Sequence, residues 1–436
     1  MSVTKIALRN LSRQKRRTFL LGGAIAFGVL VATLVNGFTG GLVMNIEANV
    51  SKMVAGHIFM FSVYKDPNNR TIMSMDENPG VDAAVKSLKF PVAFTQKRTQ
   101  IMATLVFESN SIGRTVEGVD WNKDQFLMGD LKLSAGRVED LSDPRAVLLS
   151  QKQADKLGVR VGEEIFIQAE TIHGQQNFDA FLVKAIFDDS GSSVSSSAYI
   201  GLDAANKLLD MAPGSFNLFG VTLKRFGDTD AATDALVAAL PSSLNVLDRA
   251  KARGQGFRDL YAAFKKDKKN RGPETIVTNV NDALASIKGQ ILAVNFLALM
   301  VLTVLLAVVM VGLTNTYRII VFERSREIGT MRAMGMQRGE VQAIFVLEAI
   351  FLSLGGVVVG VFVATLLLIG ISLFSFGNGN SALAFILSSG HLAWRLDIVT
   401  LIVTTALVAG MTWLAALFPA RRAGKVDPAV ALRTTA

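Results

Sequence analysis

The sequence has no cysteine and only three histidines in 436 residues. Without cysteine the chain forms no disulfide, and a thiolate metal site is excluded. His57, His173 and His391 lie far apart, and we interpret each as a structural or surface residue. The sequence also lacks a G-x-x-x-x-G-K-[ST] phosphate loop, a G-x-S-x-G nucleophile elbow and an H-E-x-x-H motif. We therefore predict that the chain is not an enzyme, has no catalytic residues and binds no metal or cofactor of its own.

Long apolar runs are absent from the middle of the sequence, between Leu42 and Gln290. A helix needs about 20 mostly apolar residues to cross a bilayer, and four runs outside this region satisfy that length. We predict transmembrane helices over residues 18–41, 291–317, 341–374 and 397–418. The first run is longer than the apolar part of a signal peptide and no convincing cleavage site follows it, so we expect it to be retained.

Basic residues are concentrated near the ends of these helices. The net charge of +9 comes from outside residues 42–290, where 16 of the 45 basic but only 6 of the 36 acidic residues lie. Short loops rich in Lys and Arg remain in the cytoplasm, so we predict cytoplasmic termini, a cytoplasmic loop over 318–340 and a short external loop over 375–396. The positive charge near the helix ends attracts anionic lipid headgroups, and it gives no support to nucleic-acid binding.

Residues 42–273 are predicted to form a large α+β domain outside the membrane, inserted between the first two transmembrane helices. We interpret Ser190–Ser197 as a flexible loop, the Lys265–Arg271 run as a solvated face, and residues 274–290 as a helical stalk. Apolar alternation predicts strands over His57–Val63, Ala146–Leu149, Glu164–Gln168, Phe181–Ile186 and Gly220–Leu223. Helical periodicity predicts helices over Val81–Leu88, Gln151–Leu157, Leu202–Leu209 and Thr229–Leu240.

The N-terminal residues 1–17 have an amphipathic pattern. Val3, Ile6, Ala7 and Leu11 fall on one side of a helix and the basic residues fall on the other. We favour a helix that lies along the inner membrane surface over the alternative that these charges only set the orientation of the chain.

Glu348 is the one charged residue well inside a predicted span. An ionisable group deep in a membrane often marks an ion pathway. Glu348 lies near the cytoplasmic end of its helix, which makes it a poor candidate for an ion relay. Two interpretations remain open at this point. Glu348 either pairs with a basic residue of the 318–340 loop or simply reaches water at the interface.

Two segments bring the chain close to a known group. The stretch from Glu323 to Arg338, followed by Leu347-Glu348-Ala349, resembles the loop between transmembrane helices two and three of ABC-transporter permeases of the macrolide-exporter, cell-division and lipoprotein-releasing superfamily. The segment from Phe418 to Arg433 resembles the closing motif of the same superfamily, with Val430 where an acidic residue is frequent. The N-terminal Ala7-Leu8-Arg9-Asn10 also fits, and the four-helix layout covers the whole chain.

This resemblance implies that the loop contains a coupling helix that receives a separate ATPase. The residues agree, because Glu327 to Met334 can form two helical turns that Gly335 ends, with an apolar ridge of Ile328, Met331 and Met334 suited to a partner's groove. The alternative is a surface helix on lipid headgroups. We expect the ATPase to contact seven residues of this segment: Glu323, Arg326, Glu327, Ile328, Met331, Arg332 and Met334.

Within the superfamily, Asn36-Gly37-Phe38 and the following Gly56-His57-Ile58 resemble the lipoprotein-releasing permeases. By analogy, a dimer would enclose a cavity for acyl chains, and helical spacing points to Leu297, Val301, Val304 and Val308 as cavity residues; these could equally face bulk lipid. The small-xxx-small pairs Gly37/Gly41 and Gly356/Gly360 suit close helix approach.

The leading hypothesis is a permease subunit of the inner membrane that couples ATP hydrolysis to the release of lipoproteins. Its expected partners are cytoplasmic ABC ATPase subunits that hold the ATP and Mg²⁺, a second copy or a paralogue of the chain, a periplasmic lipoprotein carrier, and membrane lipids. One alternative is an exporter of peptides or small amphiphiles that works with an adaptor protein. Another is a regulator of a cell-wall hydrolase, for which the external domain is larger than usual.

Overall fold

The computed structural model describes residues 3–13, 15–124, 127–128, 131–188, 197–267, 272–374 and 391–425. The chain divides into two compact units. Among the described residues, the membrane unit lies within Met1–Val43, Gln290–Ser375 and His391–Ala436, and the inserted domain lies within Met44–Gly289.

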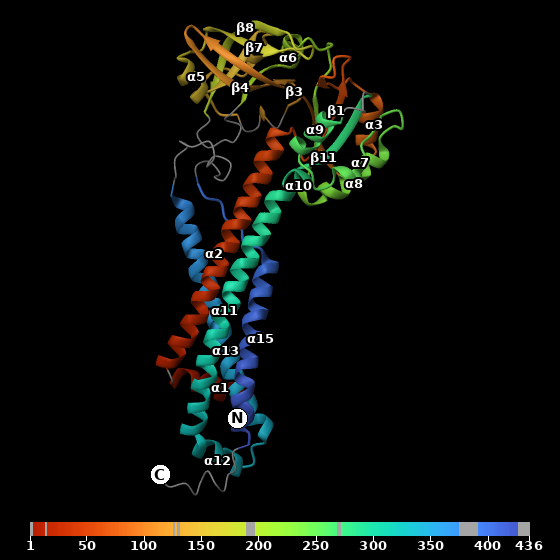
Figure 1. The fold of residues 1–436 in the computed structure, drawn as a ribbon. Coiled ribbons are helices and arrows are strands. Elements are labelled where there is room, and N and C mark those ends of the chain that lie inside the picture. Colours follow the sequence, from red (N-terminus) through yellow and green to blue (C-terminus); the bar gives the residue numbers. More distant parts are fainter. Residues whose placement is uncertain are drawn as a thin grey trace. The chain divides into compact units, whose positions relative to one another are not determined.

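The secondary-structure elements in the described part of the membrane unit are all helices, and a short non-helical segment, 391–397, precedes the last of them (Figure 1). Four of them are long and apolar enough to cross a membrane, as the sequence predicts, and each contributes side chains to one shared core. In that core Ile25 and Val29 meet Leu302, Val357 and Val408. The helices are α1 Val3–Arg13, α2 Lys15–Met53, α11 Ala285–Glu323, α12 Ser325–Ala333, α13 Arg338–Leu373 and α15 Ile398–Ala423.

Glycines allow α13 to approach α2 closely. A Cβ atom on Gly360 would lie 2.5 Å from the carbonyl oxygen of Ala26, and one on Gly356 would lie 2.9 Å from Cγ2 of Ile25. The Gly356/Gly360 pair therefore acts as predicted, because any side chain there would collide with the neighbouring helix.

The inserted domain is a mixed α/β structure in which the sheet has eleven strands. The strands are β1 Ile58–Lys65, β2 Thr71–Met73, β3 Val92–Phe107, β4 Asn110–Val119, β5 Leu133–Gly136, β6 Ala146–Ser150, β7 Glu164–Glu170, β8 Gln176–Phe187, β9 Ser197–Gly201, β10 Leu218–Leu223 and β11 Glu274–Asn279. The helices are α3 Pro79–Lys86, α5 Gln151–Leu157, α6 Leu202–Leu209, α7 Thr229–Ala239, α8 Arg249–Ala252, α9 Phe257–Lys266 and α10 Val280–Ala283, with 3-10 turns η1 Glu139–Ser142 and η3 Phe226–Asp228.

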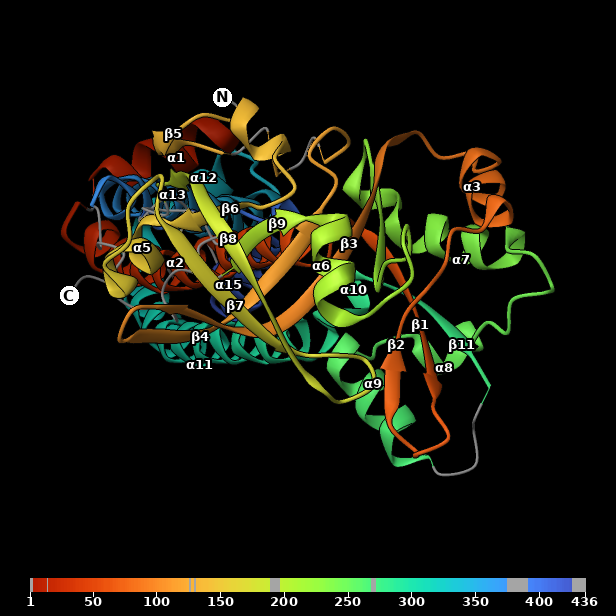
Figure 2. The same ribbon diagram turned by 90° about the horizontal axis from the view of Figure 1, so that it is seen from above.

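Six of the strands close into a barrel. The path runs from β3 through β4, β9, β6 and β8, and β7 completes it by pairing with both β8 and β3 (Figure 2). Every second residue of β7, including Ile165 and Ile167, points into the interior with Leu105, Val116 and Leu149. Closure leaves no unpaired edge among these strands and buries one continuous apolar core.

Three of the remaining strands form a smaller sheet in the order β11-β1-β10-β3, which shares the first part of β3 with the barrel. Of the other two, β2 pairs with β1 and β5 pairs with β8 of the barrel. Side chains of β1 alternate between its faces. Ile58 and Met60 pack towards α3 and α7, whereas Phe59 and Phe61 pack towards α8 and α9. Because helices cover both faces, seven of the eight residues of β1 are buried, and its first four residues are all apolar.

A buried ionic cluster joins β3 to β4. The guanidinium of Arg98 lies 2.9 Å from Glu117 Oε2 and 2.8 Å from Asp124 Oδ2, and all three side chains are almost wholly buried. Burial raises the pKa of Glu117, an effect that the Arg98 charge and a hydrogen bond from Ser197 oppose. Each charge in the cluster needs its partners, because burying an unpaired charge away from water is strongly destabilising.

The strand and helix predictions for the inserted domain are largely confirmed, with α5 and α6 matching their predicted ranges. The helical stalk over 274–290 is wrong in its first part, since β11 occupies Glu274–Asn279 and pairs with β1. Its run of β-branched residues favours a strand, and Ile276 and Val277 are buried on opposite faces of it. The predicted loop at Ser190–Ser197 falls outside the described residues except for Ser197, which begins β9.

Candidate functional site

The candidate site is the connection between α11 and α13, which contains the helix α12. The helix ends as predicted, at Gly335 with a positive φ of 99°. There the Gly335 N–H donates to Arg332 O and the Met336 N–H donates to Met331 O, each at 3.1 Å. A capping box between Gln337 and Glu340 then starts α13. The local sequence thus determines both the helix and its end.

One face of α12 is buried in the chain itself. Ile328 is 1% exposed and packs with Tyr317, Val341 and Phe345. Met331 is partly buried against the same cluster, whereas Met334 is 78% exposed. The predicted docking ridge is therefore wrong as a continuous surface. Each step of three residues turns about 60° around a helix, so the ridge winds from the core at Ile328 to solvent at Met334.

The opposite face of this connection is open. Glu323, Arg326 and Glu327 are exposed together with Met334. Arg332 is partly buried, and its Nη1 donates to the carbonyl of Gly424 at 3.4 Å, just beyond α15. The seven predicted coupling residues thus divide into four that a partner can reach and three that hold α12 in place: Ile328, Met331 and Arg332.

A polar node fixes α12 to two other helices. Arg324 precedes α12 and donates through Nη2 to Asn10 Oδ1 at 3.0 Å, while Asn10 Nδ2 donates to Glu348 Oε1. Arg324 Nη1 lies 3.9 Å from Glu348, and its Nε donates to Glu327 Oε2 at 2.7 Å. Glu348 is 5% exposed. The pairing with a basic loop residue is therefore confirmed, and the alternative of a carboxylate open to water is wrong.

Asn10 is the residue of this node whose role we did not predict from the sequence. It lies on the same helical face as Ile6 and Ala7, so a polar side chain interrupts the apolar stripe of α1. That interruption is the signal that could have identified it. Beside the node a cavity of about 20 Å³, lined in part by Asn10, Thr18, Tyr317 and Glu348, has room for one water molecule.

The four predicted cavity residues lie together on an exposed strip of α11. The exposed fractions are 54% for Leu297, 42% for Val301, 58% for Val304 and 68% for Val308. Leu302 and Leu306, on the other side of the helix, face the core. The strip is thus available to lipid or to a second chain, and its role in a cavity remains a prediction.

The Asn36-Gly37-Phe38 step has a structural role within the chain. Asn36 Oδ1 accepts a hydrogen bond from the Asp397 N–H at 3.0 Å, and the carbonyl of Gly37 accepts one from the Arg395 N–H at 3.0 Å. These bonds anchor α2 to the segment before α15. The step is therefore explained by packing, without reference to a substrate.

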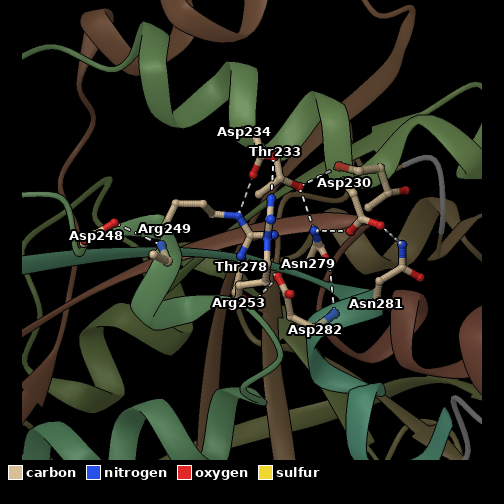
Figure 3. A network of polar contacts seen from close by, with 12 residues as sticks. Asp230, Thr233, Asp234, Asp248, Arg249, Arg253, Thr278, Asn279, Asn281 and Asp282 are labelled. Atoms are coloured by element: carbon tan, nitrogen blue, oxygen red, sulfur yellow. Dashed lines mark hydrogen bonds and ion pairs between the residues drawn. The ribbon is translucent and has the colours of Figure 1, made fainter. Parts of the chain in front are cut away.

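At the other end of α11, a polar network surrounds the short helix α10 (Figure 3). Asn279 is fully buried, caps α10 by accepting from the Asp282 N–H, and donates to Asp230 Oδ1 and Thr233 Oγ1 of α7. Arg249 of α8 lies 2.7 Å from Asp282. The start of α11 is thus tied to two helices of the inserted domain.

Two family models match the chain: a MacB-like periplasmic core domain over residues 18–239, and an FtsX-like permease C-terminal region over residues 299–428. The first alone spans just over half of the sequence. The chain belongs to the MacB/FtsX family of ABC transporter permeases. The described part of this permease contains no group of three or more His, Asp or Glu side chains that could hold a metal ion.

Three relatives illustrate the similarity. The permease is 23% identical to the uncharacterized ABC transporter permease YknZ of Bacillus subtilis, with 98% of each chain covered. It is 24% identical to the macrolide export ATP-binding/permease protein MacB of Vibrio parahaemolyticus (98% of this chain, 59% of the relative). It is 26% identical to the uncharacterized ABC transporter permease MJ1507 of Methanocaldococcus jannaschii (69% and 65%). The chain thus spans less than two thirds of the last two.

Solved structures of extracytoplasmic domains also match. The extracellular domain of YknZ aligns with 42% of this chain and 92% of its own, at 14% identity and a TM-score of 0.29. The periplasmic region of MacB from Actinobacillus actinomycetemcomitans aligns with 55% of this chain and 95% of its own, at 11% identity and a TM-score of 0.32.

Proposed function

We propose that this permease transmits the work of a cytoplasmic ABC ATPase to its inserted domain on the other side of the inner membrane. The observation that carries this proposal is the continuity of α11. This one helix of 39 residues, about 58 Å long, begins directly after the network around Asp282 and ends one residue before α12. In this proposal, movement of α12 passes along this one helix to the inserted domain.

The ATPase, with its ATP and Mg²⁺, docks on the exposed face formed by Glu323, Arg326, Glu327 and Met334. This face offers both signs of charge around one exposed apolar side chain, a combination typical of a polar rim around an anchor. The node of Arg324, Asn10 and Glu348 then carries movement of the docked helix to α1 and α13. A second permease chain covers the strip from Leu297 to Val308.

An amphiphile is the substrate class that we propose, taken up beside the apolar strip of α11. Export of small amphiphiles is the first candidate, because several relatives are named macrolide export ATP-binding/permease proteins. Lipoprotein release with a periplasmic carrier is the second candidate. Its support is the resemblance of the Asn36-Gly37-Phe38 step, whose hydrogen bonds already have a structural explanation.

Docking is tested by purifying the full-length permease from its own host in nanodiscs and measuring the ATPase that accompanies it. We expect Met334→Asp to reduce the bound ATPase by about tenfold or more, since loss of an interface anchor costs roughly 2 kcal/mol. Leu8→Asp serves as the control, because Leu8 is 53% exposed but lies on α1. An unchanged amount of ATPase in the Met334 variant would refute docking at this face.

The substrate class is tested separately in proteoliposomes that contain the permease and its ATPase. ATP-dependent efflux of a macrolide supports the first candidate, and ATP-dependent release of a triacylated lipoprotein supports the second. If neither is moved while Met334→Asp still reduces ATPase binding as expected, the amphiphile assignment is wrong and the coupling assignment stands.

A further inference from the structure

A groove lies where the ends of α11 and α15 meet the start of α12. Its volume is about 270 Å³, and its lining consists of Arg318, Val321, Phe322, Ser325, Pro419 and Arg422. One wall is therefore apolar, and two guanidinium groups stand at the groove. The polar node around Glu348, in the same unit, differs from this groove because its side chains already form hydrogen bonds with one another.

The two arginines of the groove differ from other arginines nearby. Arg324 pairs with Glu327 and Asn10, and Arg332 bonds to the carbonyl of Gly424. Arg318 and Arg422 are exposed, and no carboxylate within the described ranges forms an ion pair with either of them. The guanidinium of Arg422 lies over the ring of Phe418, 5.9 Å from its centroid. The groove thus offers positive charge that the described residues leave uncompensated.

The depth of these residues is set by their sequence positions. Arg318 directly follows the apolar run of α11 that ends at Tyr317, and Arg422 follows the run of α15 that ends at Phe418. Cations in such positions lie at the level of lipid phosphates. Phe322 and Phe418 are 83% and 67% exposed, so each presents a large apolar surface beside the charges. A ligand that joins an anionic group to an apolar body would match both the charges and the phenylalanines at this depth.

We propose that this groove binds an anionic phospholipid of the leaflet that faces α12. The phosphate lies between the guanidinium groups of Arg318 and Arg422, and an acyl chain packs along Val321 and Phe322. Arginine suits this role because its planar fork donates two parallel hydrogen bonds to phosphate oxygens. Ser325 is the first residue of α12, so the bound lipid contacts the start of the helix on which the ATPase is proposed to dock.

The test uses the full-length permease in nanodiscs of phosphatidylcholine mixed with phosphatidylglycerol. After transfer to detergent, native mass spectrometry counts the phosphatidylglycerol molecules retained per chain. We expect the double variant Arg318→Gln/Arg422→Gln to retain about tenfold less than the parent. The matched control is Arg421→Gln/Lys425→Gln, which removes the same charge from exposed residues that do not line the groove. That control is expected to retain the lipid.

Ser325→Glu is a second variant that keeps both arginines but places a carboxylate against the phosphate, and it is also expected to lose phosphatidylglycerol. Equal retention by the parent and the double variant would overturn the proposal, as would equal loss from the control, which indicates diffuse attraction to charge. Displacement of the lipid by millimolar inorganic phosphate alone would also overturn it, because the groove would then be a small-anion site.

Discussion

Nη1 of Arg249 lies 2.7 Å from Oδ2 of Asp282, and the two side chains are 11% and 5% exposed. Arg249 belongs to α8, and Asp282 belongs to α10, the last turn before α11 begins. The same guanidinium donates through Nε to Asp234 of α7 at 3.0 Å. A single residue therefore links two helices of the inserted domain to the start of the long helix that we propose to transmit movement (Figure 3).

Replacing Arg249 with Met should leave Asp282 buried without its charge partner. Removing one member of a buried pair costs about 3 to 5 kcal/mol, so we expect a lower unfolding temperature of the inserted domain and substrate transport that falls more than ATPase activity. Arg253→Met is the control, because Arg253 pairs with the same Asp234 at 2.7 Å but is 62% exposed. Equal effects of the two substitutions would show that Arg249 has no special role.

Ile328→Ala should destabilise the membrane unit by about 2 to 5 kcal/mol, because it opens a cavity in a closed core. Met334→Ala should change stability by less than about 0.5 kcal/mol, since Met334 is 78% exposed, and should act on ATPase binding instead. Thermal unfolding in detergent and ATPase copurification separate the two effects. The division of α12 into a buried and a docking face fails if Ile328→Ala leaves the unfolding temperature unchanged.

Gly360→Ala should push α13 away from α2, because the added Cβ would lie 2.5 Å from a backbone oxygen that cannot move aside. Overpacking of this kind costs about 1 to 3 kcal/mol. Gly355→Ala is the matched control on the same helix, since no atom lies within 4 Å of its added Cβ. We expect the control to be neutral or stabilising, because Ala is the better helix former. Unfolding temperatures in one detergent provide the comparison.

His57 should make the inserted domain less stable in acid. The Leu223 N–H donates to His57 Nδ1 at 3.2 Å, a bond that needs an unprotonated Nδ1. Burial lowers the pKa of His57 in the folded state, whereas an unfolded histidine titrates near pH 6.5. As the pH falls through about 6.5, the unfolded chain binds a proton that the folded chain does not, so stability decreases.

This pH effect is measured as the change in unfolding temperature of the full chain between about pH 7 and about pH 5. His57→Gln keeps an acceptor but does not titrate, so its unfolding temperature should depend less on pH. An identical pH dependence in the two proteins would assign the effect to other groups.

The sequence by itself was sufficient to predict the four transmembrane helices, because the thickness of the hydrocarbon layer sets a minimum apolar length that each of the four runs meets. It was also sufficient for β1, α5 and α6 and for the end of α12 at Gly335, because periodicity, capping residues and a glycine act within a few residues of chain. From the sequence, an ion pair between Glu348 and a basic residue of the 318–340 loop was only one of two possibilities, the other being a carboxylate that reaches water.

The tertiary structure alone decided the rest. Closure of the barrel depends on β7 pairing with both β3 and β8, and β3 lies more than fifty residues away along the chain. The role of β11 depends on β1, which lies still further away in sequence. Whether Ile328 meets a partner or the chain's own core depends on where α11, α13 and α15 meet. A local pattern reports which side of an element is apolar, but the surface that covers that side is set by packing between distant segments.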